Sequence, residues 1–153
     1  MGTVGEDIST NIAGEFFARQ GHGVLSLAKD NVGYGVPVSY GYDVVNERCI
    51  IQLVFEGESQ KRPFVETAEK VTLTAYTCDA DEEWQSAIAS GQLVSLSSDD
   101  VANWAAAVFF TEAANVDARA QRSPTTDVEW YELEIETLTG RKGSEEECTP
   151  VLE

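Results

Sequence analysis

Hydrophobic and polar residues alternate along much of the chain with the period of two that is typical of β-strands. The clearest example is Gly35–Tyr42, in which Val36, Val38, Tyr40 and Tyr42 fall on one face. Further strands are predicted at Gly23–Ala28, Cys49–Phe55, Val71–Thr77, Trp84–Leu96, with a bulge or bend at Gly91, and Trp130–Thr139. Polar turns are predicted at Lys29–Asn31 and Asp43–Glu47. The pattern therefore predicts about six short strands joined by turns.

Helical periodicity appears in three other segments, which are residues 8–19, 60–68 and 101–109. In the first, Ile8, Ile12, Phe16 and Phe17 share one face, and Gly21 follows as a stop signal. Strands in close succession with a few helices around them predict a mostly β fold with flanking helices (α+β), built on an antiparallel sheet or small barrel.

The chain of 153 residues suits one domain, and neither a repeat nor a linker divides residues 1–153. Residues from about 143 onward have the composition of an acidic tail, and residues 119–127 that of a loop. No apolar run is long enough to cross a bilayer, so we expect no membrane contact. The polar, acidic segment Met1–Asn11 is not a secretory signal, which indicates a cytoplasmic protein.

Acidic residues outnumber basic ones by 27 to 10, which gives a formal net charge of −17. Such a surface repels phosphate backbones, so we expect no nucleic-acid partner. Self-repulsion on this scale is screened by salt, and we interpret it as adaptation to high intracellular salt, as in a halophilic organism. A cationic site stands out against this background.

Cysteine and histidine are too few and too scattered for metal or hydrolytic chemistry. Cys49, Cys78 and Cys148 lie far apart, which argues against a zinc site or a disulfide framework, and we expect unpaired thiols. The single histidine, His22, lies between two glycines and has no nucleophile elbow to serve. We therefore expect no metal, and we identify no catalytic acid, base or nucleophile.

A phosphate site is indicated where the second predicted helix begins. The segment Gly57–Arg62 follows an apolar strand and holds two of the ten basic residues, Lys61 and Arg62. Free N–H groups at a helix start attract anions, Ser59 can cap the helix or donate to a phosphate, and the two cations can neutralise it. Pro63 falls in the first turn, where proline is tolerated. An ordinary helix start with solvated bases is the alternative.

Three stretches together resemble a known flavoprotein family. They are Gly23–Ala28 leading through a turn into Gly35–Tyr42, then Ser59-x-Lys61-Arg62, and finally Tyr131–Ile135 followed by Thr139–Lys142. Their order and spacing, over roughly Ala13 to Leu138, resemble the split β-barrels of the pyridoxamine 5′-phosphate oxidase superfamily, and most closely its shorter oxidase-related members. The resemblance implies a six-stranded antiparallel split barrel that binds FMN at the interface of a homodimer.

The resemblance also implies which residues contact the flavin. Val36, Pro37, Val38, Ser39 and Tyr40 would lie along the isoalloxazine and ribityl chain, with Ser39 and backbone groups as polar contacts. A second set would complete the site, with Val54 and Phe55 flanking the flavin, Ser59, Gln60 and Lys61 holding its phosphate, and Arg62 as a weaker candidate.

The family likeness implies an FMN-dependent oxidoreductase whose small-molecule redox substrate the sequence does not name. The acidic end, Ser144–Glu153, lacks the arginine-containing motif of true pyridoxamine phosphate oxidases, so we do not expect vitamin B6 oxidation. Two alternatives remain open: an FMN-binding sensor or carrier without turnover, and a barrel that binds deazaflavin or haem, for which His22 is the conventional ligand available.

Overall fold

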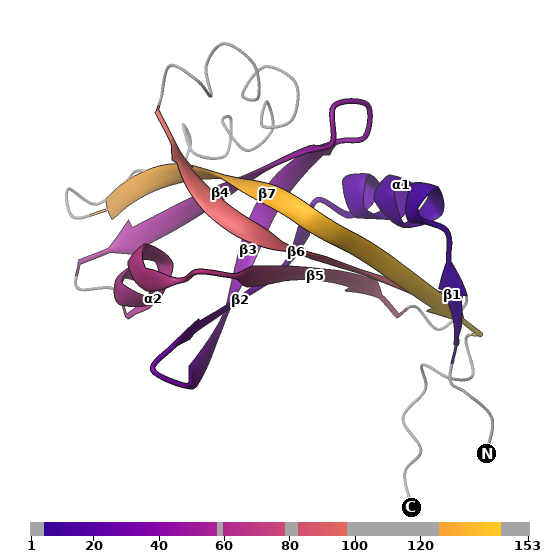
Figure 1. Cartoon of the computed structure of the whole chain (residues 1–153), viewed down its shortest axis with the longest axis horizontal. Helices are drawn as coiled ribbons and strands as arrows, with labels where there is room; N and C mark the ends of the chain where they lie inside the picture. Colours follow the sequence, from indigo (N-terminus) through magenta and orange to yellow (C-terminus); the bar gives the residue numbers. More distant parts are fainter. Residues whose placement is uncertain (1–4, 58–59, 79–82, 98–125, 145–153) are drawn as a thin grey trace, which may run out of the picture.

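The fold was obtained as a computed structural model that describes residues 5–57, 60–78, 83–97 and 126–144. The predicted helix at 101–109 lies outside these residues, as does most of the acidic tail. The described elements are β1 (Glu6–Ile8), α1 (Thr10–Gln20), β2 (His22–Lys29), β3 (Val32–Asp43), β4 (Arg48–Glu56), α2 (Lys61–Thr67), β5 (Val71–Thr77), β6 (Trp84–Leu96) and β7 (Thr126–Gly143). Figure 1 shows the strands wrapped around a common interior.

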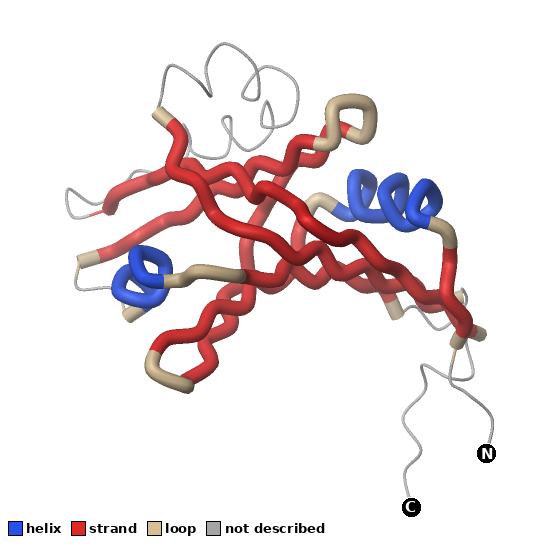
Figure 2. The backbone as a smooth tube through the Cα atoms, viewed as in Figure 1, coloured by secondary structure: helices blue, strands red, loops and turns tan. Residues whose placement is uncertain are grey.

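The strands form one antiparallel sheet in the order β1-β7-β4-β3-β2-β5-β6, and β6 also pairs with β7. That last pairing closes six strands, β2 to β7, into a ring, while the short β1 adds to one side of β7. The structure thus confirms the predicted six-stranded antiparallel barrel. Figure 2 shows the two described helices well separated, with α1 packed against β6 and β7 and α2 against β2 and β3.

Strand β7 is longer than the sequence pattern predicts. We expected a loop up to Asp127 and a strand at Trp130–Thr139, whereas the strand runs from Thr126 to Gly143. Its first half pairs with β4, from Thr126 to Leu133, and its end pairs with β1, from Gly140 to Lys142, while β6 follows it on the other side. Partners on both sides satisfy the backbone of polar residues that carry no local strand signal.

The core follows the predicted alternation. Val36, Val38, Tyr40 and Tyr42 all point inward and are at most 8% exposed. The pairing of β6 with β7 shifts register between Ser90 and Gly91, which confirms the predicted bulge. The inside of the barrel is therefore filled by side chains from alternate positions of each strand.

Helix α1 closes one side of the barrel, with a buried face that differs in part from the predicted one. Phe16 and Phe17 are buried as expected, but Ile12 is 48% exposed and Ile8 belongs to β1. The helix starts only at Thr10, and its buried positions are Ala13, Gly14, Phe16 and Phe17, which share one face.

Both ends of α1 are capped. The Ser9 side chain accepts a hydrogen bond from the Ile12 N–H, and Gly21 ends the helix in the left-handed region with φ 70°, so the predicted stop is confirmed. The Tyr40 hydroxyl donates to the Phe17 carbonyl at 2.6 Å, and the Tyr40 N–H donates to the Gly21 carbonyl at 3.0 Å. Strand β3 thereby satisfies carbonyls that the helix end leaves open.

Within the described ranges, no helix is both long and apolar enough to span a membrane.

Candidate functional site

The barrel opens between β3 and β4. These strands pair from Asp43↔Arg48 to Ser39↔Gln52, and the pairing ends there. Beyond that point β3 continues with β2, and β4 continues with β7 as far as Glu56↔Thr126. Because each strand follows a different neighbour, the two diverge, and their facing edges turn backbone groups toward the gap. This divergence is the split of the barrel.

A groove of about 330 Å³ lies at the split. Its lining residues come from β2, β3, β4 and α2, and they are His22, Pro37, Val38, Ser39, Gln52, Leu53, Val54 and Lys61. Pro37 lies just beyond the last β3–β4 pair, so β3 is an edge strand on that side, where a residue without an N–H is tolerated. Among the lining residues that the structure describes, Lys61 is the one cation and none is a carboxylate. In a chain of net charge −17, that composition makes the groove suited to an anionic ligand.

The structure brings five of the predicted flavin contacts to this groove, namely Pro37, Val38, Ser39, Val54 and Lys61. It places Val36 and Tyr40 in the core, because alternate residues of β3 face inward. Phe55 is also buried, at 1% exposed. Gln60 is exposed just before α2, and Ser59 lies outside the described residues.

Three groove residues were not predicted from the sequence: His22, Gln52 and Leu53. The register places His22 opposite Ser39 and Ser39 opposite Gln52, so three polar side chains form one row across β2, β3 and β4. A signal for Gln52 existed, since it is the polar interruption of an apolar strand. Its position in one row with His22 depends on how the strands pair, and the local sequence pattern does not predict this pairing.

Hydrogen bonding orients the imidazole of His22. The Gln20 Nε2 donates to the Tyr76 carbonyl oxygen at 3.2 Å, which fixes the side-chain amide, and the same nitrogen lies 3.3 Å from the His22 Nε2. This contact places the imidazole of His22 beside the amide of Gln20, which Tyr76 holds in place. The β2 end of the row is therefore restrained by its neighbours.

Helix α2 supplies the cation of the groove. It has seven residues, and its N-cap, Gln60, makes no side-chain capping bond. A helix this short adds little dipole, so the case for an anion rests mainly on Lys61. The Lys61 Nζ lies 5.5 Å from the centroid of the Phe55 ring. Arg62, the next residue, is absent from the groove lining and faces acidic side chains of β7 and α2.

Residues 11–142 match the family model described as pyridoxamine 5′-phosphate oxidase. The chain belongs to this family. No curated protein matches it significantly.

Solved structures share the fold of this pyridoxamine 5′-phosphate oxidase family member at low identity. A FAD-binding protein from Mesorhizobium loti has a TM-score of 0.73 and 15% identity, over 93% of this chain and 100% of that one. The FAD-binding protein from Mycobacterium smegmatis has a TM-score of 0.60 and 18% identity, over 93% and 99%. A heme-binding protein from the same organism has a TM-score of 0.65 and 12% identity, over 92% and 60%. These likenesses confirm the fold.

The outer face of the barrel beside the groove is hollowed and apolar in this family member. A hollow of about 520 Å³ shares His22 and Pro37 with the groove and continues over β2 and β5. On this face Val24 is 38%, Tyr76 62% and Ile88 42% exposed. Large apolar side chains gathered on one exposed face are typical of interaction surfaces.

The cysteines divide into two kinds. Cys49 is fully buried, and burial raises the pKa of its thiol well above the ordinary range, so it is an inert core residue. Cys78, which follows β5, is disulfide-bonded, which corrects the expectation of an unpaired thiol there. Across the described ranges, no group of three or more His, Cys, Asp or Glu residues is arranged to hold a metal.

Proposed function

We propose that the groove binds FMN and that the protein is an FMN-dependent oxidoreductase. The observation that carries the proposal is the groove at the β3–β4 split, which combines exposed strand edges with the cation of Lys61 and has no carboxylate among its described lining residues. Its volume, about 330 Å³, lies at the lower end of the range for ligand pockets. The residues present fit a planar, hydrogen-bonding ligand that ends in a phosphate.

The chain's own residues would bind and orient the flavin, which supplies the redox chemistry when bound. Lys61, with Ser59 and Gln60, would hold the phosphate. The polar row of His22, Ser39 and Gln52 would meet the hydrogen-bonding edge of the ring. Apolar lining from Pro37 and Val54, which alternate with the core positions of their strands, would cover the ring face and exclude water. Oxidation of a vitamin B6 phosphate is not part of the proposal, because the described lining of the groove holds one cation and a second phosphate would need another.

A homodimer would complete the site. The groove is open to solvent on one side and adjoins the apolar face of β2, β5 and β6, where Val24, Tyr76 and Ile88 are exposed. A second copy packed on this face would bury those side chains and wall the groove. Sedimentation of the native protein and of Tyr76→Asp tests this arrangement. We expect a dimer for the first and a monomer for the second, and a monomeric native protein would contradict it.

The test of the phosphate site compares FMN with riboflavin, which lacks the phosphate. Lys61→Ala removes a charge-assisted contact, so we expect FMN binding to weaken by roughly 10- to 100-fold. Riboflavin binding, measured by the same fluorescence titration, should be nearly unchanged. Lys70→Ala serves as the matched control, because Lys70 pairs with Glu136 at 3.1 Å, outside the groove. Equal losses for both flavins would refute the assignment.

Two other functions are distinguished by spectrum and turnover. Haem is favoured by one observation, that His22 lines the groove, and a similar structure is a heme-binding protein. The absorption spectrum of the purified protein separates haem, deazaflavin and flavin. A tightly held flavin without turnover, with a nicotinamide donor and artificial acceptors, would instead identify a sensor or carrier.

We also propose a cytoplasmic location and adaptation to high salt. The net charge of −17 supports the salt adaptation, and a melting temperature that does not rise with added KCl would contradict it. The disulfide at Cys78 is unusual for a reducing cytosol, so cell fractionation decides the location.

A further inference from the structure

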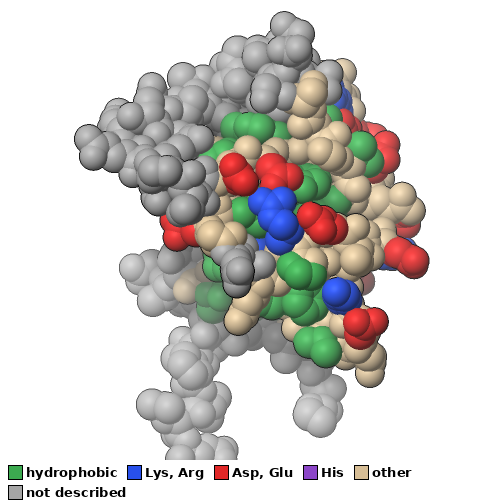
Figure 3. Space-filling model, turned by 90° about the vertical axis from the view of Figure 1, so that its left-hand side faces the viewer, with side chains coloured by type: hydrophobic (Ala, Val, Ile, Leu, Met, Phe, Trp, Pro, Cys, Tyr) green, Lys and Arg blue, Asp and Glu red, His purple; other side chains and the backbone are tan. Residues whose placement is uncertain are grey.

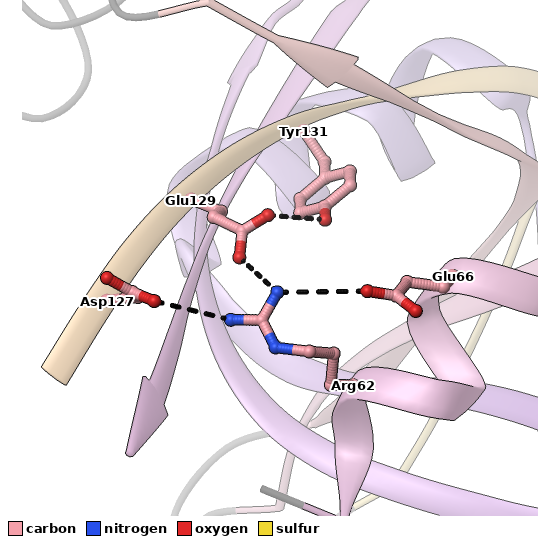
Figure 4. Close-up of polar contacts among 5 residues, drawn as sticks. All are labelled: Arg62, Glu66, Asp127, Glu129 and Tyr131. Atoms are coloured by element: carbon pink, nitrogen blue, oxygen red, sulfur yellow. Dashed lines mark hydrogen bonds and ion pairs between the residues drawn. The ribbon is translucent and has the colours of Figure 1, made fainter. Parts of the chain in front are cut away.

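Arg62 lies at the junction of α2, β4 and β7, and its guanidinium is held by three carboxylates (Figure 4). Its Nη1 donates to the Glu129 Oε2 at 2.7 Å. Its Nη2 lies 3.6 Å from the Asp127 Oδ2, and its Nη1 lies 3.9 Å from the Glu66 Oε1. The second oxygen of Glu129 accepts from the Tyr131 hydroxyl at 3.1 Å. Glu129 is therefore fixed from both sides.

The same guanidinium stacks on a core residue of the neighbouring strand. Its central carbon lies 4.1 Å from the centroid of the Phe55 ring, and Phe55 is 1% exposed. Stacking on this buried ring adds direction to the ion pairs. Arg62 is thus restrained by β7 through charge and by β4 through packing.

The charge around Arg62 argues against a direct role in binding phosphate. Three carboxylates surround one guanidinium, and Figure 3 shows basic side chains enclosed by acidic ones on this face. A phosphate approaching Arg62 would meet net negative charge. Lys61, one residue earlier, lines the groove instead.

Helix α2 needs such restraint because a helix of seven residues has little stability of its own. Phe64 stacks on Tyr34 of β3 at 5.0 Å, and Val65 is buried, so the later part of the helix is fixed by packing. Arg62 fixes the first turn, which carries Lys61.

We propose that Arg62 is a positioning residue, which clamps the first turn of α2 to β7 and thereby holds Lys61 at the phosphate end of the groove. This inference rests on the proposed binding of FMN. It assigns Arg62 to the support of the site. It also gives a supporting role to Glu129, which is far from Arg62 in the sequence but in contact with it.

The two roles of Arg62 predict opposite results for Glu129→Gln. If Arg62 positions Lys61, both Glu129→Gln and Arg62→Gln should weaken FMN binding by about tenfold, the loss expected for one charge-assisted hydrogen bond. The double variant should be little worse than either single one, because both break the same contact. If Arg62 binds the phosphate directly, Glu129→Gln should leave FMN binding unchanged or tighten it. Arg62→Lys, which keeps the charge without the fork, should fall between native and Arg62→Gln.

The measured quantity is the ratio of the dissociation constants for riboflavin and FMN, which a general loss of stability does not change. The matched control is the pair Arg48–Glu132, also 2.7 Å long, at the far end of β4. Glu132→Gln should lower the melting temperature without changing the ratio. An unchanged ratio in Glu129→Gln, or an equal change in Glu132→Gln, would overturn the inference. If Lys61→Ala still prefers FMN to riboflavin, the proposed phosphate site is wrong. If Lys61→Ala loses this preference but Glu129→Gln keeps it, the phosphate site stands and only the positioning role of Arg62 is wrong.

Discussion

Replacing Tyr40 by Phe tests how β3 supports helix α1. The Tyr40 hydroxyl donates to the Phe17 carbonyl at 2.6 Å, and the two rings stack with centroids 4.4 Å apart. Tyr40 is 3% exposed, so water does not replace a lost partner. The change to Phe keeps the stacked ring and removes only the donor. A buried carbonyl then loses one bond, which costs about 1–2 kcal/mol of unfolding free energy.

For a protein of this size the loss corresponds to a fall in melting temperature of about 2–8 °C. Urea denaturation followed by circular dichroism, at one protein concentration, measures the free energy directly. Tyr34→Phe is the control, because the same atom is removed from a ring that is only partly buried and that also stacks on a phenylalanine, Phe64. We expect the control to change the free energy of unfolding by less than about 0.5 kcal/mol.

The same variant separates the core from the groove. Tyr40 was predicted from the sequence to lie along the flavin, whereas its side chain points into the core. Tyr40→Phe should therefore leave the FMN dissociation constant unchanged. If Tyr40→Phe is as stable as the native protein, the hydroxyl bond does not contribute as described. If the variant folds but no longer binds FMN, the side chain of Tyr40 is not confined to the core.

Two further predictions concern the bulge and alkaline stability. A methyl group at Gly91 would overlap the Glu134 carbonyl oxygen of β7, whereas one at Gly33 would meet nothing within 4 Å. In thermal melts, Gly91→Ala should therefore cost about 2 kcal/mol or more, and Gly33→Ala less than about 0.5 kcal/mol; similar losses would contradict the bulge geometry. Burial, together with Glu129, raises the pKa of Tyr131 from 10.0 to about 12. As the pH rises, the Tyr131 hydroxyl loses its proton in the unfolded chain before it does so in the folded protein. The contribution of the protonated hydroxyl to stability is therefore complete below pH 10 and is lost as the pH rises to about 12. Urea melts at pH 9 and pH 11 should show a smaller decline for Tyr131→Phe than for the native protein, and equal declines would exclude the effect.

Much of the fold could be predicted because its signals are local. The alternation at Val36–Tyr42 predicted which side chains face inward, and Gly21 and Gly91 marked a helix end and a bulge that the structure confirms. The errors fall where pairing overrides the local pattern. Gly140–Lys142 lack a strand signal, yet they lie in β7 because β1 and β6 supply partners on both sides.

The groove was predicted in part for the same reason. The cation at the start of α2 and the run around Pro37 carry signals in composition and order, so Lys61, Pro37 and Ser39 could be found from the sequence. His22 and Gln52 could not, because each becomes a groove residue only through the strand beside it.

By itself the sequence determined the period of each element, the faces turned to the core and the charge of −17, since these depend on residues close together in the chain. Only the tertiary structure decided where the pairing of β3 and β4 stops, and hence where the barrel opens. It also separated two adjacent cations, because Lys61 lies in the groove and Arg62 contacts the carboxylates of β7. Both outcomes depend on which distant strand becomes the neighbour, a choice made by packing the whole barrel at once.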